Sequence, residues 1–260
     1  MEWVVVDDVS TGLAMYRTGQ LDCGPMEFWT VRQHDLEALQ QSHPHLQYQD
    51  IQANGGALLA MRTDHPPFND VRVRRAISMA FDRQALVAAL AVRGQPTPAI
   101  PPGLVEWSLP IEQLGAGAQY YQYDPQEARR LLAEAGFAKG VQTQLSATGG
   151  TGFGTDLLDS VQLIQRLLKD IGVRAELKLQ EFGAYVATTA RGKFEGLAYG
   201  RIPIAWYADW PLYRPYVQPD NMSHVNDPTF TAMFNAQRRT QDVEARKKIV
   251  FDMQRYAAEQ

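Results

Sequence analysis

The strongest hydrophobic pattern in the chain lies between residues 124 and 180, where helical and strand-like periods follow one another. Asp124-Pro125-Gln126-Glu127 has the residues of a helix start, with aspartate as the N-cap and proline at the first helical position. Gly136 suits the left-handed position that ends a helix. The segment therefore predicts a helix whose buried face consists of Ala128, Leu131, Leu132 and Ala135.

A β-α-β crossover is predicted directly after this helix. Val141–Leu145 alternates as a strand, and the apolar positions between Leu157 and Ile171 recur at helical spacing until Gly172. Residues 173–179 then alternate strictly between apolar and charged side chains, which is typical of a half-buried strand. This order of elements predicts at least one parallel pair of strands.

The segment His65–Leu86 predicts another helix. Pro66 and Pro67 are expected to hold the chain extended, and Asn69 or Asp70 offers a capping oxygen. The three arginines of the first turns are unusual, because the helix dipole disfavours cations there. Asp70 can offset Arg74 at i,i+4, and we expect the other two to meet carboxylates of neighbouring segments. The predicted buried face consists of Val73, Ile77, Ala80, Val87 and Ala91.

The rest of the chain predicts shorter elements around one long irregular stretch at 93–118, which is rich in proline and glycine. A stretch of this length in a compact protein is usually functional or wraps a surface. Strands are expected over Trp3–Val6, Leu21–Cys23, Leu46–Ile51, Ala57–Met61 and Leu197–Ile204, and helices before Gly19 and over Val31–Gln41, Phe182–Ala190, Pro228–Arg239 and Val243–Ala258.

Composition narrows the class of protein. The 260 residues suffice for one large domain or two ordinary ones, and 45% hydrophobic with 21% charged residues is an ordinary globular mixture. The net charge of -4, without a long basic run, argues against a nucleic-acid surface. The single cysteine, Cys23, excludes a disulfide within the chain. No apolar run approaches the roughly 20 residues that span a bilayer, and the first residues lack the pattern of a signal peptide.

The best candidate site is the cluster Trp206-Tyr207-Ala208-Asp209-Trp210. A carboxylate among aromatic rings can bind a cationic group, because desolvation strengthens the ion pair and the rings add cation–π attraction. A peptide α-amino group would fit. The alternative is that the aromatic residues belong to the core and Asp209 caps a turn. Arg201 pairs either with a ligand carboxylate or with Asp209.

Sequence support for a metal site, a phosphate-binding loop or a catalytic site is weaker. His34, His43 and His45 are interpreted as surface residues rather than zinc ligands, and no metal or cofactor is expected. The glycine-rich stretch 149–154 lacks the Lys-Ser/Thr pair of a phosphate-binding loop. No nucleophile elbow or zincin helix occurs, so a binding module is favoured over an enzyme.

Three segments together resemble family 5 of the extracytoplasmic solute-binding proteins of ABC importers, the oligopeptide- and dipeptide-binding type. The first runs from Pro66 to Arg74 and on to Ala76 and Asp82-Arg83. The second is Tyr123-Asp124-Pro125 with Ala128, Leu131-Leu132 and Glu134-Ala135-Gly136, and the third is Ile171-Gly172-Val173 with Trp206 and Asp209 downstream. Their order and spacing match the family over nearly the whole chain.

The resemblance implies an α/β fold, the periplasmic-binding-protein-like type II clamshell with a mixed sheet flanked by helices. Residues 1–55 would be the C-terminal portion of the first lobe and 56–260 most of the second lobe without its returning strand, so that the chain would be truncated at both ends. The hinge is expected near Gln52–Ala57. In peptide-binding members a Trp-x-x-Asp holds the ligand's amino terminus, and Trp206 and Asp209 match it.

The implied function is capture of peptides or similar small solutes between two lobes and their delivery to ABC permease subunits in the membrane. The binding protein would be a monomer, located in the periplasm or anchored at the cell surface as a lipoprotein. The alternative is the ligand-sensing domain of a cytoplasmic transcription regulator with the same fold.

Overall fold

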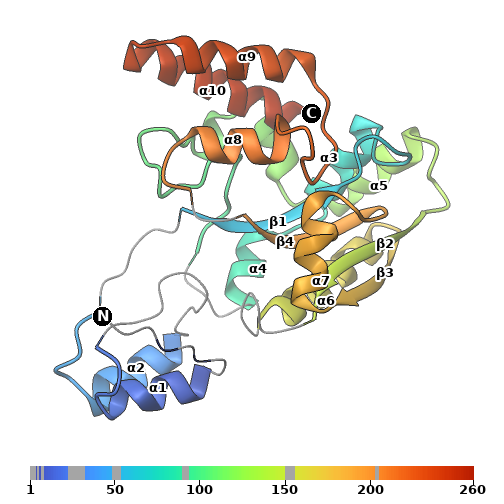
Figure 1. Cartoon of the computed structure of the whole chain (residues 1–260). Coiled ribbons are helices and arrows are strands. Elements are labelled where there is room, and N and C mark those ends of the chain that lie inside the picture. The colour runs from blue at the N-terminus through green and yellow to red at the C-terminus, as the bar shows by residue number, and fades with distance from the viewer. Residues whose placement is uncertain are drawn as a thin grey trace.

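The computed structural model describes residues 4, 6, 9–22, 33–48, 54–89, 94–149, 156–202 and 205–260. Figure 1 shows helices α8, α9 and α10 above a sheet, with α1 and α2 at the lower left. The helices are α1 (Val9–Arg17), α2 (Gln33–Ser42), α3 (Val71–Met79), α4 (Arg83–Ala89), α5 (Pro125–Glu134), α6 (Asp156–Asp170), α7 (Phe182–Ala187), α8 (Asp209–Tyr216), α9 (Pro228–Arg239) and α10 (Val243–Glu259). The strands are β1 (Gly56–Met61), β2 (Val141–Thr148), β3 (Val173–Gln180) and β4 (Leu197–Ile202), and short 3-10 helices are η1 (Ile111–Gln113), η2 (Gly115–Tyr121) and η4 (Thr189–Arg191).

The sheet confirms the predicted crossover. Its strand order is β1-β4-β2-β3, with β2 and β3 parallel from the pair Val141 and Val173 onward. Strand β4 is also parallel to β2, whereas β1 pairs antiparallel with β4. The described part of the chain therefore has the mixed sheet flanked by helices that was expected.

The main core lies on one face of this sheet. Alternate residues of β2, β3 and β4 point to that face, as the period of a strand requires, and helices α3, α5 and α6 cover them. Its fully buried side chains include Val73, Ile77, Leu145, Leu168 and Leu197. The intervening positions Ala60 and Ala198 pack with Phe194 in a separate, smaller cluster.

A second core joins α8, α9 and α10 to the irregular stretch before η1. Its buried members are Ile100, Ala208, Leu212, Phe230, Phe234, Val250 and Met253. Buried Gln254 of α10 fixes the irregular stretch, because its side chain accepts from Leu109 N at 3.0 Å and donates to Trp107 O at 2.8 Å. The long stretch thus wraps a helical surface, as its length suggested, although it contains η1 and the first residues of η2.

The helix predicted after Pro66–Pro67 is wrong in two details. The Pro66–Pro67 bond is cis, and the chain turns there instead of running extended. The single predicted helix is two helices, because α3 ends at Met79 and Asp82 accepts from Ala85 N at 2.9 Å to start α4. Asp70 is the N-cap of α3, accepting from Arg72 N at 2.8 Å.

The arginines of α3 have only some of the predicted partners. Asp70 attracts Arg74 electrostatically, as predicted, but its direct ion pair is with Arg72, at 2.6 Å. Arg75 Nε donates to the main-chain oxygen of Glu259 at 3.0 Å, and Arg74 Nε to that of Gln260 at 2.8 Å. Arg72 thus meets a carboxylate of its own segment rather than of a neighbouring one. For Arg75 the expected carboxylate is wrong, because its partner, like that of Arg74, is a carbonyl oxygen. These carbonyls lie at the C-terminal end of α10, where the helix dipole favours cations.

The remaining element predictions have mixed outcomes. The helix starting at Asp124 is confirmed, since Asp124 accepts from Gln126 N and Glu127 N and Gly136 has a φ of 93°. Several further predictions are confirmed within the described residues. They are the helices before Gly19, over 31–41, over 228–239 and over 243–258, and the strands at 57–61 and from Leu197. The strand predicted from Leu46 is wrong for residues 46–48, and Leu21 and Asp22 form no strand. Val4 and Val6 of the predicted strand Trp3–Val6 form no strand either. Residues 3, 5, 23, 49–51, 203 and 204 of the predicted strands lie outside the described residues.

Candidate functional site

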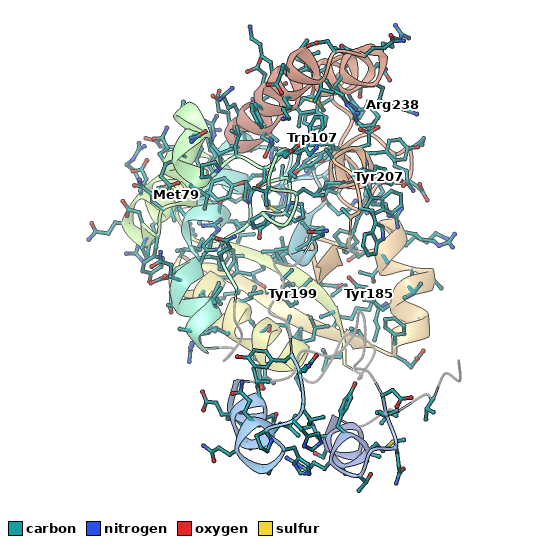
Figure 2. All side chains as sticks on the ribbon, turned by 90° about the vertical axis from the view of Figure 1, so that its left-hand side faces the viewer. Met79, Trp107, Tyr185, Tyr199, Tyr207 and Arg238 are labelled. Carbon is teal, nitrogen blue, oxygen red and sulfur yellow. The ribbon has the colours of Figure 1, made fainter. Side chains whose placement is uncertain are left out.

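The candidate site follows strand β4, at the point where two chain segments run together. Ala205 N donates to Asn54 O at 3.0 Å, so the segment that leads into β1 lies against the segment that follows β4. Trp206 and Tyr207 come next, with 72% and 57% of their surfaces exposed. Tyr207 is labelled at the right-hand side of Figure 2, below Arg238. The alternative that these aromatic residues belong to the core is therefore wrong for Trp206 and Tyr207.

Asp209 begins helix α8, and its carboxylate contacts the two helices that follow. Its Oδ1 accepts from Arg246 Nη2 at 2.5 Å and from Gln237 Nε2 at 3.2 Å. Its Oδ2 lies 3.7 Å from Arg238 Nε, and 22% of the side chain is exposed. Asp209 does not cap a turn, because α8 has no side-chain cap bond and both hydrogen bonds of the carboxylate go to α9 and α10.

Gln237 is the buried centre of this arrangement. Its Oε1 accepts from Arg246 Nε at 2.9 Å while its Nε2 donates to Asp209, so the amide contacts both members of the ion pair. A buried amide with both ends bonded fixes the orientation of its partners, because an alternative orientation would leave polar atoms without partners. The Asp209 side chain is therefore held in one place before any ligand arrives.

Trp107 supports the same guanidinium from the irregular stretch. The Arg246 Cζ atom lies 5.0 Å from the centroid of the Trp107 ring, within the range of a cation–π contact. Lys247 Nζ lies 6.0 Å from the same ring and pairs with Glu244 and Glu106. The irregular stretch thus contributes one side chain to the back of the site.

The sequence analysis missed Gln237, Arg238, Arg246 and Trp107. Gln237 and Arg246 are 28 and 37 positions from Asp209, and no local pattern connects residues at such separations. Trp210 is half-buried in α8. Arg201 belongs to β4, where its backbone is opposite Ala57, and its side chain lies outside the described residues.

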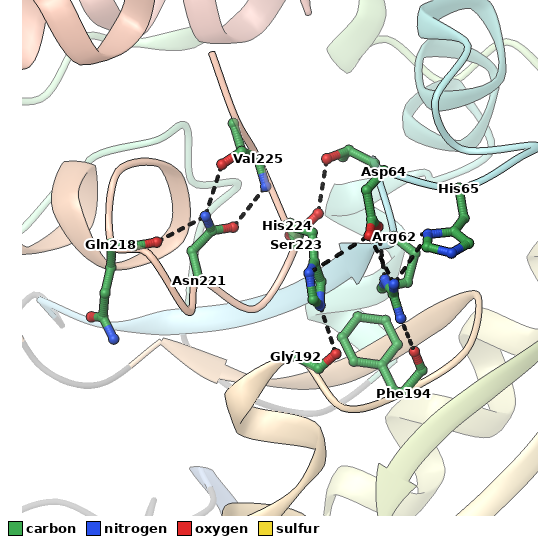
Figure 3. Close-up of polar contacts among 11 residues, drawn as sticks. Arg62, Asp64, His65, Gly192, Phe194, Gln218, Asn221, Ser223, His224 and Val225 are labelled. Atoms are coloured by element: carbon green, nitrogen blue, oxygen red, sulfur yellow. Dashed lines mark hydrogen bonds and ion pairs between the residues drawn. The ribbon is translucent and has the colours of Figure 1, made fainter. Parts of the chain in front are cut away.

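A second polar cluster lies at the far end of β1 (Figure 3). Arg62 donates to both oxygens of Asp64, at 2.7 and 2.8 Å, and His65 Nδ1 lies 3.0 Å from Asp64 Oδ2. The Arg62 hydrogen bonds hold the pKa of Asp64 well below its usual range, against the opposing effect of burial. His224 Nδ1 is 3.7 Å from the same carboxylate, and its Nε2 is 2.7 Å from Gly192 O. The cluster joins three loops at one end of the sheet.

The described residues also bear on metal binding and membrane insertion. Among residues with a described placement, no group of three or more His, Cys, Asp or Glu side chains is arranged to hold a metal ion. Within the same part of the chain, no helix has both the length and the apolar character needed to cross a membrane.

The family follows from a direct match. The model for bacterial extracellular solute-binding proteins, family 5 Middle, matches residues 1–223. The chain belongs to this family. The resemblance based on the proline-rich helix start, the Asp-Pro helix start and the Trp-x-x-Asp segment is therefore confirmed. Family 5 proteins are binding proteins rather than enzymes, in agreement with the expected absence of catalytic function.

The chain is similar to parts of longer family 5 proteins. The chain is 34% identical over 176 residues to di/tripeptide-binding protein 2 of Pseudomonas aeruginosa, a match that covers 66% of this chain and 31% of that protein. It is 32% identical over 188 residues to the glutathione-binding protein GsiB of Salmonella typhimurium, covering 71% of this chain and 33% of that protein. The chain thus spans well under half of the length of these curated relatives.

The fold of family 5 is shown by a solved structure. The periplasmic binding protein DppA from Helicobacter pylori, in complex with the peptide STSA, superposes with a TM-score of 0.79 at 20% identity. The superposition covers 98% of this chain and 48% of that one. The α/β fold predicted from the resemblance is therefore confirmed, and this chain corresponds to about half of a periplasmic binding protein.

Proposed function

We propose that this chain is part of the peptide-capturing component of an ABC importer, which encloses a peptide or similar solute between two lobes and delivers it to the permease. Membership of family 5 supports the class of protein. The names of the relatives, which bind di- and tripeptides or glutathione, support the class of ligand. Because the chain covers about half of a periplasmic binding protein, a further lobe would be needed to enclose the ligand.

The proposed boundary between the lobes lies at residue 55, with 1–55 in the first lobe and 56–260 in the second. The contact between Ala205 and Asn54 supports it, because the chain enters the sheet at β1 and leaves it after β4 at the same place. A pair of adjacent crossing segments is suited to a hinge, and Gly55 and Gly56 can absorb changes in φ and ψ. Ligand contacts made only in the closed form would then shift the population toward closure.

The observation that carries the proposal is the position of Asp209, a partly exposed carboxylate beside two exposed aromatic side chains and next to this crossing. Asp209 would anchor a cationic end of the ligand, and Trp206, Tyr207 and Trp210 would form walls of the pocket. Arg201, on the strand that leads into the site, is a further proposed contact for ligand.

The proposed location is the periplasm, or the cell surface through a lipid anchor, and the proposed state is a monomer that docks on permease subunits. The periplasmic binding protein that shares the fold supports this location. Sequence encoded upstream in the same reading frame tests it directly. A secretion signal agrees with transport, whereas a DNA-binding helix-turn-helix would contradict it and indicate a regulator.

The binding proposal is tested by isothermal titration of the encoded protein, with any flanking sequence of its reading frame, against a mixture of di- and tripeptides. We expect saturable binding that Asp209→Asn weakens by tens of fold, since a charge-assisted contact contributes about 1.5–3 kcal/mol. Asp159→Asn, at an exposed position of α6, removes the same charge as a control. Absence of any binding contradicts the function, and unchanged affinity in Asp209→Asn contradicts the anchor.

A further inference from the structure

Asp209, the proposed partner of the ligand's cationic end, is already surrounded by more positive charge than its own negative charge neutralises. Two guanidinium groups, those of Arg246 and Arg238, lie within 4 Å of the single carboxylate of Asp209. The nearby Lys247 is matched by Glu244 and Glu106. The charge of this three-residue group is therefore +1, and a ligand that brings only an ammonium ion would not balance it.

The two oxygens of Asp209 have different surroundings. Oδ1 accepts hydrogen bonds from Arg246 and from buried Gln237. Oδ2 receives no hydrogen bond from any residue whose side chain the structure describes, and Arg238 Nε lies 3.7 Å from it. Oδ1 is thus used for holding Asp209 in place, which leaves Oδ2 for a ligand donor.

Arg238 is the accessible cation of the group. It lies in the last turn of α9, and 61% of its side chain is exposed, compared with 30% for Arg246. Its guanidinium carbon is 5.9 Å from the Phe234 ring centroid, which supports the side chain from its own helix. A planar guanidinium with exposed donors is well suited to a carboxylate, which it can bind through two parallel hydrogen bonds.

We propose that Asp209 Oδ2 and Arg238 together recognise a ligand head that carries an ammonium group and a carboxylate on the same carbon. This inference rests on the proposed function and specifies its substrate class. In an ordinary α-linked peptide the first carboxyl group is consumed by the amide bond, so only the ammonium remains at that carbon. A side-chain-linked peptide of the γ-glutamyl type keeps both charges there. Such a ligand supplies an acceptor to Arg238 and a donor to Asp209. Its carboxylate keeps the charge of the site at +1, whereas an ammonium group alone would raise it to +2.

The test uses two isomers of equal composition and charge, γ-glutamyl-alanine and α-glutamyl-alanine, titrated calorimetrically into the encoded protein. We expect the γ isomer to bind about tenfold more tightly, the effect of one added charge-assisted contact. Arg238→Gln should remove most of this preference. Arg239→Gln takes the same charge from the adjacent exposed position and should keep the preference. Because both positions are exposed, thermal unfolding of both variants should match that of the parent protein.

The outcomes separate the two proposals. Equal affinity for the isomers, or an isomer preference that Arg238→Gln leaves intact, overturns the assignment of Arg238. If alanyl-alanine also binds in that case, the peptide-binding function stands and only the head-group specificity fails. If neither isomer nor alanyl-alanine nor the peptide mixture binds, the proposed function fails, and the specificity fails with it.

Discussion

The two hydrophobic cores of this chain differ in how their residues are connected along the sequence. The core on the sheet is centred on consecutive elements, β2, α6 and β3, with α3 and α5 packed against them. The core around α8, α9 and α10 joins Ile100 to residues more than a hundred positions later. Asp209 belongs to the second region, and its partners come from α9 and α10. The sheet core is therefore specified mainly by patterns within neighbouring segments of the sequence. The candidate site, in contrast, depends on contacts between distant segments.

The largest effects are expected when one fully buried leucine is shortened in each core, which tests whether only the second core supports the site. Leu145→Ala in β2 and Leu212→Ala in α8 should each lower the free energy of unfolding by about 3 kcal/mol, through lost burial and a cavity. Only Leu212→Ala should also weaken peptide binding, by about tenfold, because it loosens the helix that begins at Asp209. Denaturant unfolding and titration calorimetry measure the two effects.

The two leucines serve as controls for each other, since both deletions remove the same atoms from fully buried positions. Equal loss of affinity in both variants would mean that the site depends on overall stability and not on the second core in particular. Unchanged affinity in Leu212→Ala would mean that Asp209 is held by its polar partners alone.

A smaller effect is expected where the irregular stretch meets α10. Gln254→Met keeps the size of the buried side chain but leaves Leu109 N and Trp107 O without their side-chain partner. We expect a loss of about 2 kcal/mol in the free energy of unfolding, the cost of buried polar groups without hydrogen bonds. Denaturant unfolding measures it. Gln119→Met, at an exposed position of η2 where the side chain donates to Ala116 O at 2.8 Å, provides a milder comparison. A variant as stable as the parent would show that water or rearrangement satisfies these groups.

The smallest effect concerns the loop cluster around Asp64. The pKa of Asp64 is lower in the folded state than its usual 3.8, because Arg62 donates to both carboxylate oxygens. The stabilisation is therefore complete above about pH 5 and is lost as the pH falls through 3.8 toward the folded value. With 33% of the side chain exposed, Asp64→Asn should cost about 1 kcal/mol at pH 7, and less at pH 3.

Thermal unfolding at the two pH values measures this difference. Asp159→Asn, at an exposed position of α6, is the control for removing one carboxylate outside the Asp64 cluster. A gap between Asp64→Asn and the parent protein that stays constant from pH 7 to pH 3 would contradict the role assigned to Arg62.

The predictable part of the fold is the part with local signals. Asp124 and Gly136 mark helix ends through their own side chain or backbone freedom, and alternation along 173–179 identifies a strand without reference to the rest of the chain. The break between α3 and α4 was missed because Ala80 and Val87 continue the helical spacing across it. The strand predicted at 46–48 failed because its apolar residues had no neighbouring strand to pair with among the described residues.

The candidate site was only partly predictable for the same reason. Trp206, Tyr207 and Asp209 are adjacent in sequence, so their pattern could be recognised. Gln237, Arg238 and Arg246 lie on helices whose charges look like ordinary exposed faces. Only the packing of α9 and α10 against α8 brings them to Asp209 and changes the electrostatic character of the site.

The contacts from Arg74 and Arg75 to the end of α10 also bear on the order of folding. They connect residues 186 and 184 positions apart, and closing so long a loop costs far more chain entropy than joining β2, α6 and β3. During synthesis the sheet elements leave the ribosome well before α10. The helical core should therefore assemble late, after β2, α6 and β3 have packed together. Mutations in α10 should then accelerate unfolding more than they slow folding.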